Sequence, residues 1–394
     1  MPKLVKMGII GTGLAAVLHL EGMKSLRGVK VEIAAISARN RAKLTDFAAK
    51  YQIPKTYTDW RDLVRDPEIE VIDLCAPTNL HEAMIAEIAR YHKHVICEKP
   101  LTGFFGDQLG IDLVGRDVPR QQMLVEVQRQ IEATRQALAE GGIKFMYAEN
   151  WVYAPPFRKM AHLLKASGGT ILDIRAEASH SGSTAAYSRR WKEAGGGALL
   201  RTGAHPVGGV LHLKYLEGMA KSGAPIRPVS VTAEVACNYQ NPTFQAESFA
   251  HLVKDWVDVE DWGMACINFD DGSKALVLAS DCVLGGVKNE MTVYTSNSVL
   301  TMDMSQNDTL TSYAPVPGIF GNEYLNEKLS TDAGWNRPAA DDFWMRGFSA
   351  EMEDFIDCVH SEREPESGWY LAEATLKIIY AAYLSAEQGR RVAL

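Results

Sequence analysis

The feature that most constrains the fold is a glycine-rich turn that joins a compact apolar run to a helical pattern near the start of the chain. The run from Val5 to Ile10 indicates a buried strand, and Gly11-Thr12-Gly13-Leu14-Ala15-Ala16 follows it at once. This spacing fits G-x-G-x-x-[G/A]. In that motif the first glycine permits a tight turn, the second lets the backbone approach a pyrophosphate, and the small last residue keeps helix and strand close. A tight strand-to-helix turn without a ligand has a similar sequence. We expect a dinucleotide-binding turn with contacts at Gly11, Thr12, Gly13, Leu14 and Ala15.

The apolar runs along the 394 residues predict two domains of different architecture. In the first part, strand-like runs such as Val29–Ile36 and Val71–Ala76 alternate with amphipathic stretches, which is typical of a parallel sheet covered by helices. Later runs follow one another without crossover helices, and residues 270–273 (DDGS) indicate a hairpin turn. We therefore expect an α/β Rossmann domain over residues 1–145 and an α+β domain with a large, mostly antiparallel open sheet over residues 146–394. The terminal helix is expected to pack back on the first domain.

The end of the second predicted strand bears on which dinucleotide is bound. In NAD-binding proteins this strand usually ends in a carboxylate that holds the ribose 2′-hydroxyl. Residues 35–41 read AISARNR and contain no carboxylate. Ser37 can bond a phosphate oxygen, and Arg39 or Arg41 can neutralise its charge, so we expect NAD(P) with NADP favoured over NAD. The alternative is that the arginines form a solvated helix start.

The most specific stretch of the chain is residues 90–101, RYHKHVICEKPL. It resembles the gKHVxxEKPl signature of the glucose–fructose oxidoreductase, inositol dehydrogenase and rhizopine-catabolism (Gfo/Idh/MocA) family. In that family the lysine lies beside the nicotinamide and the substrate hydroxyl, and Lys99 is the matching position, next to Glu98. A lysine at the carboxyl end of a parallel strand points into the cofactor crevice. There it can orient the substrate oxygen and stabilise developing negative charge. The alternative is a surface Glu–Lys pair before a turn.

The loop after the third predicted strand carries the same resemblance. Residues 77–81 (PTNLH) are similar to the family's tPnxxH loop, which lines the nicotinamide side. The resemblance implies that Pro77, Asn79 and His81 join Glu98 and Lys99 in the cofactor site. A turn that caps the following helix would also account for these residues, since threonine and asparagine are good N-caps, and both explanations can hold together.

In the predicted second domain the resemblance rests on two further segments. Residues 149–155 (ENWVYAP) correspond to the segment that enters that domain, and residues 195–206 (GGGALLRTGAHP) resemble the pattern GGGxLxDxGxHxxD. The histidine of that pattern is the usual acid/base residue, and His205 matches it. Imidazole suits the role because its pKa lies near working pH. Tyr153 and His180 are further candidates for the substrate pocket, although His180 fits an ordinary loop histidine equally well.

Two departures from this pattern bear on the chemistry. Its first aspartate is replaced by Arg201 and its second by Gly208, so the carboxylate that would orient the histidine is expected to be missing. Arg201 precedes His205 by four residues, so any helical turn there places both on one face. A buried guanidinium needs an anion. That anion is either a protein carboxylate, such as Glu177 or Glu149, or a charged group of the substrate.

The chain also departs from the family in length. Residues 104–120 intervene between the EKP motif and the next helical pattern, and they mix three glycines with apolar side chains such as Phe104 and Phe105. We expect a lid that narrows the pocket or reaches a neighbouring subunit. A passive surface excursion is the alternative.

The resemblance implies an NAD(P)-dependent oxidoreductase that acts on CH–OH groups. Such an enzyme transfers a hydride between nicotinamide and a ring hydroxyl or ketone of a sugar, sugar acid or cyclitol. Some relatives instead cleave glycosides by transient oxidation, elimination and re-reduction, and an anionic sugar would fit Arg201 in that case. A dinucleotide-binding regulator is a third interpretation, against which the retained Lys99 and His205 argue. We expect Lys99 and His205 to be catalytic, and the substrate to be bound by Lys99, Tyr153, His180, Arg201 and His205.

Composition narrows the remaining possibilities. The net charge of −8 argues against a nucleic-acid partner. No apolar run reaches the roughly 20 residues that span a bilayer, and the first residues lack a signal-peptide pattern, so we expect a cytoplasmic protein without a membrane partner. The six cysteines form no C-x-x-C pair, which favours buried free thiols over a disulfide or a metal site. The resemblance further implies a homodimer or homotetramer.

Overall fold

The structure is a computed structural model, and it describes residues 3–305 and 310–394. Its first half is built on a six-stranded sheet in the order β3-β2-β1-β4-β5-β6, in which every pair is parallel. The strands are β1 (Leu4–Ile10), β2 (Lys30–Ser37), β3 (Lys55–Tyr57), β4 (Val71–Leu74), β5 (His94–Glu98) and β6 (Phe145–Ala148). This is the doubly wound Rossmann order, which confirms the fold predicted for this part of the chain.

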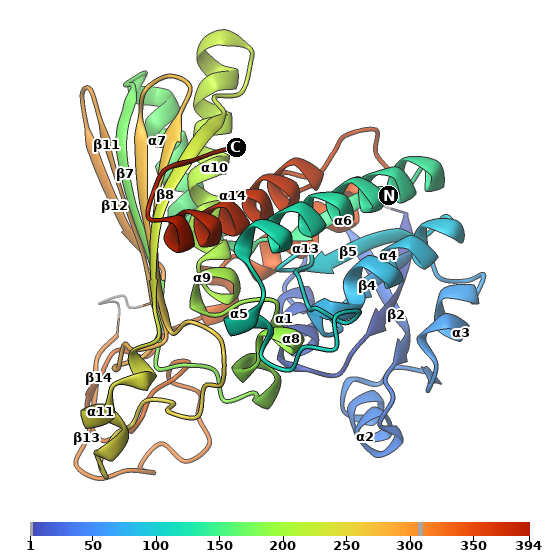
Figure 1. The fold of residues 1–394 in the computed structure, drawn as a ribbon. Coiled ribbons are helices and arrows are strands. Elements are labelled where there is room, and N and C mark those ends of the chain that lie inside the picture. The colour runs from blue at the N-terminus through green and yellow to red at the C-terminus, as the bar shows by residue number, and fades with distance from the viewer. Residues whose placement is uncertain (1–2, 306–309) are drawn as a thin grey trace.

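Helices flank this sheet and account for its apolar strands (Figure 1). Ile9 and Ile36 pack into one cluster with Ala16 and Leu44 from the helices that follow, whereas Ile72 packs into another. Strands buried on both faces read as near-continuous apolar runs, as they do here. The helices of this half are α1 (Leu14–Met23), α2 (Arg41–Tyr51), α3 (Trp60–Arg65), η1 (Thr78–Leu80), α4 (His81–Arg90), α5 (Val114–Asp117) and α6 (Arg120–Gly141).

The second half is built on a seven-stranded sheet in the order β12-β11-β7-β10-β9-β8-β15. Its neighbouring strands are antiparallel except β7 and β10, which are parallel, so the sheet is mixed and mostly antiparallel as predicted. The strands are β7 (Ile171–Ser179), β8 (Pro228–Ala236), β9 (Trp262–Phe269), β10 (Lys274–Ser280), β11 (Lys288–Thr295), β12 (Val299–Asp303) and β15 (Val392–Ala393). Burial alternates along β9, because helices cover one face of the sheet and leave the other open (Figure 1).

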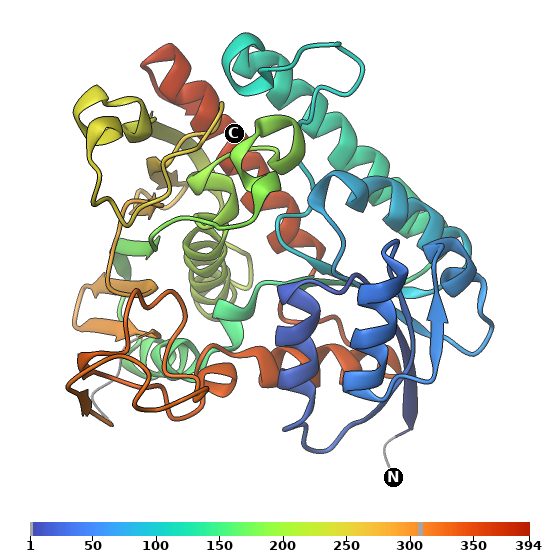
Figure 2. The same cartoon turned by 90° about the horizontal axis from the view of Figure 1, so that it is seen from below.

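The remaining elements connect and cover the two sheets. They are η2 (Asn150–Tyr153), α7 (Pro155–Ser167), η3 (Ala186–Arg189), α8 (Trp191–Ala194), α9 (Ala198–Arg201), α10 (Ala204–Ser222), η4 (Asn238–Gln240), α11 (Pro242–Ala246), β13 (Ser312–Ala314), β14 (Gly334–Asn336), α12 (Asp342–Met345), α13 (Phe348–Val359) and α14 (Trp369–Gln388). Helix α13 returns to pack on α1, and α14 lies between α6 on one side and α10 and β8 on the other (Figures 1 and 2). None of the helices in the described ranges has the length and apolar character required to cross a membrane.

The insertion after β5 is packed against the rest of the chain at its two ends. Phe104 and Phe105 are buried, and the carbonyl oxygen of Phe104 accepts a hydrogen bond of 3.0 Å from the indole nitrogen of Trp191 on α8. Further along, Asp258 accepts hydrogen bonds from the backbone of both Gly115 (2.9 Å) and Trp191 (2.8 Å). These bonds strap the two ends of the insertion to the second half of its own chain, whereas residues 107–110 between them are exposed, so the lid expected from the sequence stays a prediction.

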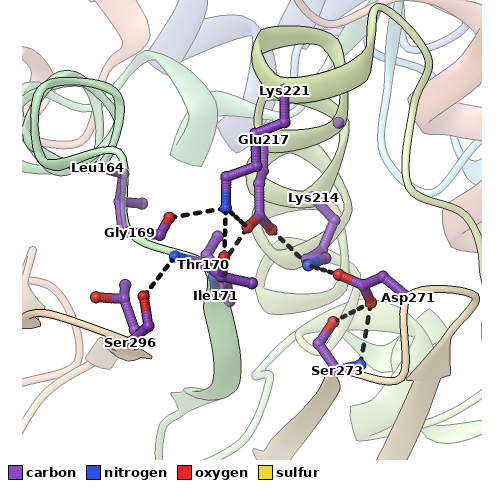
Figure 3. Close-up of polar contacts among 12 residues, drawn as sticks. Leu164, Gly169, Thr170, Ile171, Lys214, Glu217, Lys221, Asp271, Ser273 and Ser296 are labelled. Carbon is purple, nitrogen blue, oxygen red and sulfur yellow. Dashed lines mark hydrogen bonds and ion pairs between the residues drawn. The ribbon is translucent and has the colours of Figure 1, made fainter.

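Helix α10 is fixed to the sheet by a polar network near its end (Figure 3). Lys214 is fully buried and donates to Glu217 and to Asp271, the latter at 2.8 Å in the turn between β9 and β10. Glu217 also accepts a hydrogen bond of 2.9 Å from the backbone of Ile171, the first residue of β7. Since His205 lies at the opposite end of the same helix, this network sets the position of that histidine relative to the sheet.

Candidate active site

The glycine turn between β1 and α1 is drawn tight by its neighbours. Gly11 adopts φ +118°, its amide donates to the carbonyl oxygen of Ser37 at 2.9 Å, and a Cβ there would lie 2.4 Å from the carbonyl oxygen of Cys75. Only glycine meets these conditions. The turn thus brings the carboxyl ends of β1, β2 and β4 together at the start of α1.

The first turn of α1 is suited to hold a pyrophosphate. Gly13 is its N-cap residue, no side chain caps the helix, and a Cβ at Gly13 would meet no atom within 4 Å. The free amides of a ten-residue helix therefore face open space, which is the arrangement that binds an anion. Thr12 is partly exposed and Leu14 is exposed beside this space, while Ala16 is fully buried against the sheet.

The two residues predicted to hold a 2′-phosphate at the end of β2 differ in exposure. Ser37 is buried at the strand's end, and Arg39 is exposed two residues later. Within the described ranges the Arg39 side chain has neither an ion-pair nor a hydrogen-bond partner. Its guanidinium is therefore available to a ligand.

The structure separates the three loop residues predicted for the cofactor site. Pro77 and Asn79 are exposed at the end of β4. His81 is buried, and both of its ring nitrogens face backbone carbonyls: Nδ1 lies 3.1 Å from the oxygen of Pro100, and Nε2 lies 2.9 Å from that of Ala76. His81 thus braces the two loops against each other and has no nitrogen left for a ligand.

Glu98 and Lys99 end β5 at the same edge of the sheet. Glu98 accepts a hydrogen bond of 2.8 Å from the backbone of Lys99, and its other oxygen lies 3.2 Å from Nε2 of His19 on α1. Burial lowers the pKa of the Lys99 ammonium, and the nearby carboxylates Glu98 and Glu149 only partly oppose this. Lys99 donates to the backbone carbonyl oxygen of Arg201 at 2.9 Å, which joins the first sheet to the helix turn before His205.

His19 was not recognised from the sequence. Its Nδ1 lies 2.9 Å from the carboxylate of Asp73 on β4, and both side chains have no exposed surface. Burial lowers the pKa of His19, but Asp73 and Cys75 outweigh this effect and leave the pKa well above its usual value. The available signal was helical spacing, since His19 follows the buried Ala16 by one turn.

His19, Asp73 and Cys75 are residue types that bind metals, and their ligand atoms lie within 4.8 Å of one another. Their mutual hydrogen bonds account for the cluster. All six cysteines are free.

His205 has an orienting carboxylate, contrary to what the family pattern led us to expect. Its Nδ1 lies 2.8 Å from Oε1 of Glu149, which follows β6 and has no exposed surface. Its ring lies parallel to the indole of Trp151, with an interplanar angle of 6° and centroids 6.1 Å apart. Burial lowers the pKa of His205, and Glu149 opposes the shift.

The glycine block before His205 allows close packing between distant segments. A Cβ at Gly195 would lie 3.2 Å from Cα of Gly103, one at Gly196 would lie 2.5 Å from the hydroxyl of Tyr383, and one at Gly197 would lie 1.9 Å from the carbonyl oxygen of Glu260. These approaches hold the His205 turn against the segment that follows Lys99. The block therefore brings the two predicted catalytic side chains to one place.

Arg201 is paired within the protein. Its guanidinium donates to the buried carboxylate of Asp281, and it lies 4.9 Å from the centre of the Trp256 ring. His180 is on the same side, with Nδ1 3.3 Å from Asp281, and burial above all lowers its pKa to about 4. The two carboxylates suggested from the sequence have other partners: Glu177 pairs with Lys288 at 2.7 Å, and Glu149 with His205.

Tyr153 does not open onto this site. It has no exposed surface, and its hydroxyl donates to Asp354 at 2.7 Å while accepting from the backbone of Ser367 at 2.8 Å. Both hydrogen-bonding positions of the phenol are used, so its role is to hold η2 against α13 and the loop that precedes α14. A pattern match alone cannot distinguish such a residue from one that lines a pocket.

Comparison with known proteins agrees with this geometry. Residues 5–107 match the family described as "Oxidoreductase family, NAD-binding Rossmann fold", and residues 157–301 match "GFO/IDH/MocA C-terminal domain". The chain is 24% identical to myo-inositol 2-dehydrogenase of Thermotoga maritima over 176 residues, which cover 43% of this chain and 51% of that protein. It is 28% identical to human trans-1,2-dihydrobenzene-1,2-diol dehydrogenase over 181 residues, 43% and 52% of the two chains. The matched region thus spans about half the length of these relatives, and 29% of the oxidoreductase YrbE of Bacillus subtilis, at 37% identity over 26% of this chain.

Solved structures share the whole fold. GenD2 from gentamicin A biosynthesis, solved in complex with NAD, superposes with a TM-score of 0.77 at 24% identity over 100% of this chain and 97% of its own. Myo-inositol 2-dehydrogenase from Lactobacillus plantarum gives 0.74 at 19% identity over the full length of both chains. Both halves of the chain therefore match one family in sequence and in fold, and the chain belongs to the Gfo/Idh/MocA oxidoreductase family.

Proposed function

We propose that this chain is an NAD(P)-dependent oxidoreductase that transfers a hydride between nicotinamide and a CH–OH carbon of a sugar, sugar acid or cyclitol. One observation carries the proposal. Lys99, directly after β5, bonds the backbone of Arg201, four residues before His205, and its charge contributes to the lowered pKa of His205, so the ammonium and the imidazole act at one place. Hydride transfer from an alcohol needs such a pair, one group to hold the oxygen and one to take its proton.

The chain's own groups divide the work as follows. Lys99 donates to the substrate oxygen and stabilises charge that develops on it. His205 Nε2 takes the hydroxyl proton while the hydride leaves the carbon, and returns the proton in the reverse direction. A dinucleotide bound at the glycine turn supplies the hydride acceptor or donor. We assign its contacts to Gly11, Thr12, Gly13, Leu14, Ala15, Ser37, Arg39, Pro77, Asn79 and Glu98, and the substrate's to Lys99, His180 and His205.

The end of β2 favours NADP over NAD in this proposal. Ser37 and the unpaired Arg39 provide a hydroxyl and a guanidinium where NAD-binding proteins usually have a carboxylate. Arginine matches a phosphate through paired donors.

A turnover assay tests the proposal. Wild type is incubated with a panel of sugars, sugar acids and cyclitols and either cofactor, and absorbance of reduced nicotinamide is followed. Lys99→Ala and His205→Ala should each lose at least about 10²-fold in turnover while binding the cofactor with unchanged affinity. Lys159→Ala and His162→Ala, at exposed positions on α7, are matched controls. Turnover of a glycoside without net absorbance change would identify the redox-neutral cleavage instead. Near-wild-type turnover in both active-site variants would reject the proposed roles.

We also infer that the protein forms a homodimer or homotetramer through the open face of the second sheet. Leu172 on β7 and Leu276 on β10 point outward with 55% and 40% of their surface exposed, and apolar side chains on an open sheet gain by being covered. Light scattering at micromolar concentration measures the assembly, and a monomer would contradict it.

A further inference from the structure

We propose that Glu149 is the positioning carboxylate of His205, and that Gly208 is the residue that makes room for it. The proposal rests on the proposed function, because it gives His205 a proton to carry. In the family pattern the carboxylate that orients the histidine lies in the segment around His205. Here we assign that function to Glu149, directly after β6.

The segment after β6 fixes both the tilt and the hydrogen bonding of the imidazole. Glu149 reaches Nδ1 of His205 at 2.8 Å, and Trp151, two residues later, lies parallel to the ring. The backbone of Trp151 donates to the same Glu149 oxygen at 3.3 Å, so the carboxylate is itself held in place. Two residues of one short segment therefore provide an acceptor for the ring and a flat surface behind it.

This contact sets which nitrogen is free to act. A carboxylate at Nδ1 favours the tautomer with its proton on Nδ1, which leaves the lone pair of Nε2 for the substrate hydroxyl. Burial lowers the pKa of His205, Glu149 opposes this, and Lys99 adds to it. The carboxylate thus keeps the histidine basic enough to accept the proton and stabilises the imidazolium that forms.

Gly208 lies one turn after His205 on α10, against the Glu149 side chain. A Cβ at this position would lie 3.0 Å from Cγ of Glu149 and 3.3 Å from its carboxyl carbon. Such distances are tighter than ordinary contact, so a side chain at residue 208 would require Glu149 to move by a few tenths of an ångström from its present position. Gly208, which stands where the pattern has its second aspartate, therefore leaves the space that the Glu149 side chain occupies.

The residue that replaces the pattern's first aspartate is turned elsewhere. The Arg201 guanidinium pairs with Asp281, and only its backbone oxygen faces Lys99. Glu149 is therefore the carboxylate that remains for His205, and it reaches the ring from the sheet.

The experiment compares Glu149→Gln, Gly208→Ala and the double variant Gly208→Ala/Glu149→Asp with wild type. In Glu149→Gln the pKa of His205 should fall, so the acid limb of the kcat–pH profile for alcohol oxidation should move to lower pH, and kcat should drop roughly tenfold or more. Gly208→Ala should lower kcat without changing cofactor affinity. The double variant should recover part of that loss, because aspartate is shorter by the methylene that the new Cβ displaces.

Gly209→Ala is the matched control for packing. Its Cβ would lie 3.0 Å from the Met291 side chain, 3.2 Å from Phe157 and 3.4 Å from the Trp151 ring, so it tightens the packing behind the imidazole without touching Glu149. It should leave the pH profile unmoved. If Glu149→Gln also leaves both the profile and kcat unmoved, or if the double variant is no better than Gly208→Ala, the proposal is wrong.

A readout independent of turnover separates this proposal from the proposed function. NMR titration of the His205 imidazole, assigned with a His205→Gln variant, should give a lower pKa in Glu149→Gln than in wild type. An equal pKa overturns the positioning role even if the enzyme is active. A lower pKa in a protein that oxidises none of the alcohols supports the role and rejects the proposed function.

Discussion

The guanidinium of Arg201 donates to the carboxylate of Asp281, which lies 80 residues further along the chain and has no exposed surface. Trp256 covers the guanidinium, and His180 lies beside the same carboxylate. The arginine beside His205 therefore has its anion within the protein. An anionic substrate is not needed to balance this charge.

Breaking this ion pair from one side should cost more than removing it altogether. Asp281→Asn leaves the largely buried Arg201 unpaired and should lower the free energy of unfolding by about 3–5 kcal/mol. The double variant Arg201→Met/Asp281→Asn removes both charges and should be destabilised by less than Asp281→Asn alone. Urea denaturation measures the free energy of unfolding of these variants and of the single variant Arg201→Met. If the losses of Arg201→Met and Asp281→Asn add up to the loss of the double variant, the two charges do not interact.

The same pairing sets the expectation for substrate charge. Two substrates that differ only in a carboxylate should be used by wild type with kcat/KM values within about tenfold, since the Arg201 guanidinium is already paired with Asp281 and is not available to discriminate by more than about 1.4 kcal/mol. A large preference for the acidic member that disappears in Arg201→Ala would contradict this, because it would show that substrate displaces Asp281 from the guanidinium.

Cofactor preference should depend on Arg39. Replacing its unpaired guanidinium by alanine removes a paired donor from the 2′-phosphate, so the Kd for NADP should rise about tenfold while the Kd for NAD stays within about twofold. Fluorescence titration of reduced cofactor measures both. Arg90→Ala, at the exposed end of α4, is the control. Tighter binding of NAD than NADP in wild type, unchanged in Arg39→Ala, would remove the assignment.

The strap formed by residues 104–119 should support the fold. A Cβ at Gly115 would lie 1.9 Å from the carbonyl oxygen of Asp258, so Gly115→Ala should push the strap off the second half of the chain and destabilise it by roughly 1–3 kcal/mol. Gln108→Ala, at an exposed position of the same insertion, should stay within about 0.5 kcal/mol of wild type. Thermal unfolding checks the pair. Equal stability of the two variants would restore the view of a passive excursion.

Local signals were enough to predict the framework and the two ends of the site. The glycine turn, the strand before Lys99 and the segment that carries His205 each have their pattern within a few consecutive residues. The strands β3, β6, β11 and β12 were not predicted, and length alone does not explain this, because β11 has eight residues whereas β4, which was predicted, has four. Missing β6 mattered, since Glu149 follows it directly.

The charge partners could not be predicted for a physical reason. Helix and strand periodicity indicates contacts between residues within about four positions of each other. Glu149 is 56 residues from His205 in the sequence, and Asp281 is 80 residues from Arg201. The same limit applies to His81 and Tyr153, which match the family's loops. The polar side-chain atoms of His81 contact backbone carbonyls, and the hydroxyl of Tyr153 donates to a carboxylate. The folded chain, and not the local sequence, places these partners beside them.

Glu351 should make stability depend on pH. It lies in the first turn of α13 with no exposed surface, and neither carboxyl oxygen has a hydrogen-bond partner within the described ranges. Burial raises its pKa well above the usual value. His19 opposes this, and the carboxylates Glu98, Glu149 and Asp73 add to it. The native protein therefore keeps Glu351 protonated at pH values where the unfolded chain, with a pKa of about 4.3, has released the proton.

The sign of the effect follows from this difference in bound protons. Between the unfolded and the native pKa the native state holds one more proton, so the free energy of unfolding falls by up to about 1.4 kcal/mol per pH unit as pH rises through that window. Glu351→Gln stays neutral in both states and removes this slope. It should unfold with the same free energy as wild type near pH 4 and be more stable than wild type at pH 8. Glu353→Gln on the same helix is the control and should follow wild type. Urea denaturation at both pH values decides the matter, since a Glu351→Gln variant less stable than wild type at pH 8 would show that the carboxylate is ionised and paired in the native state.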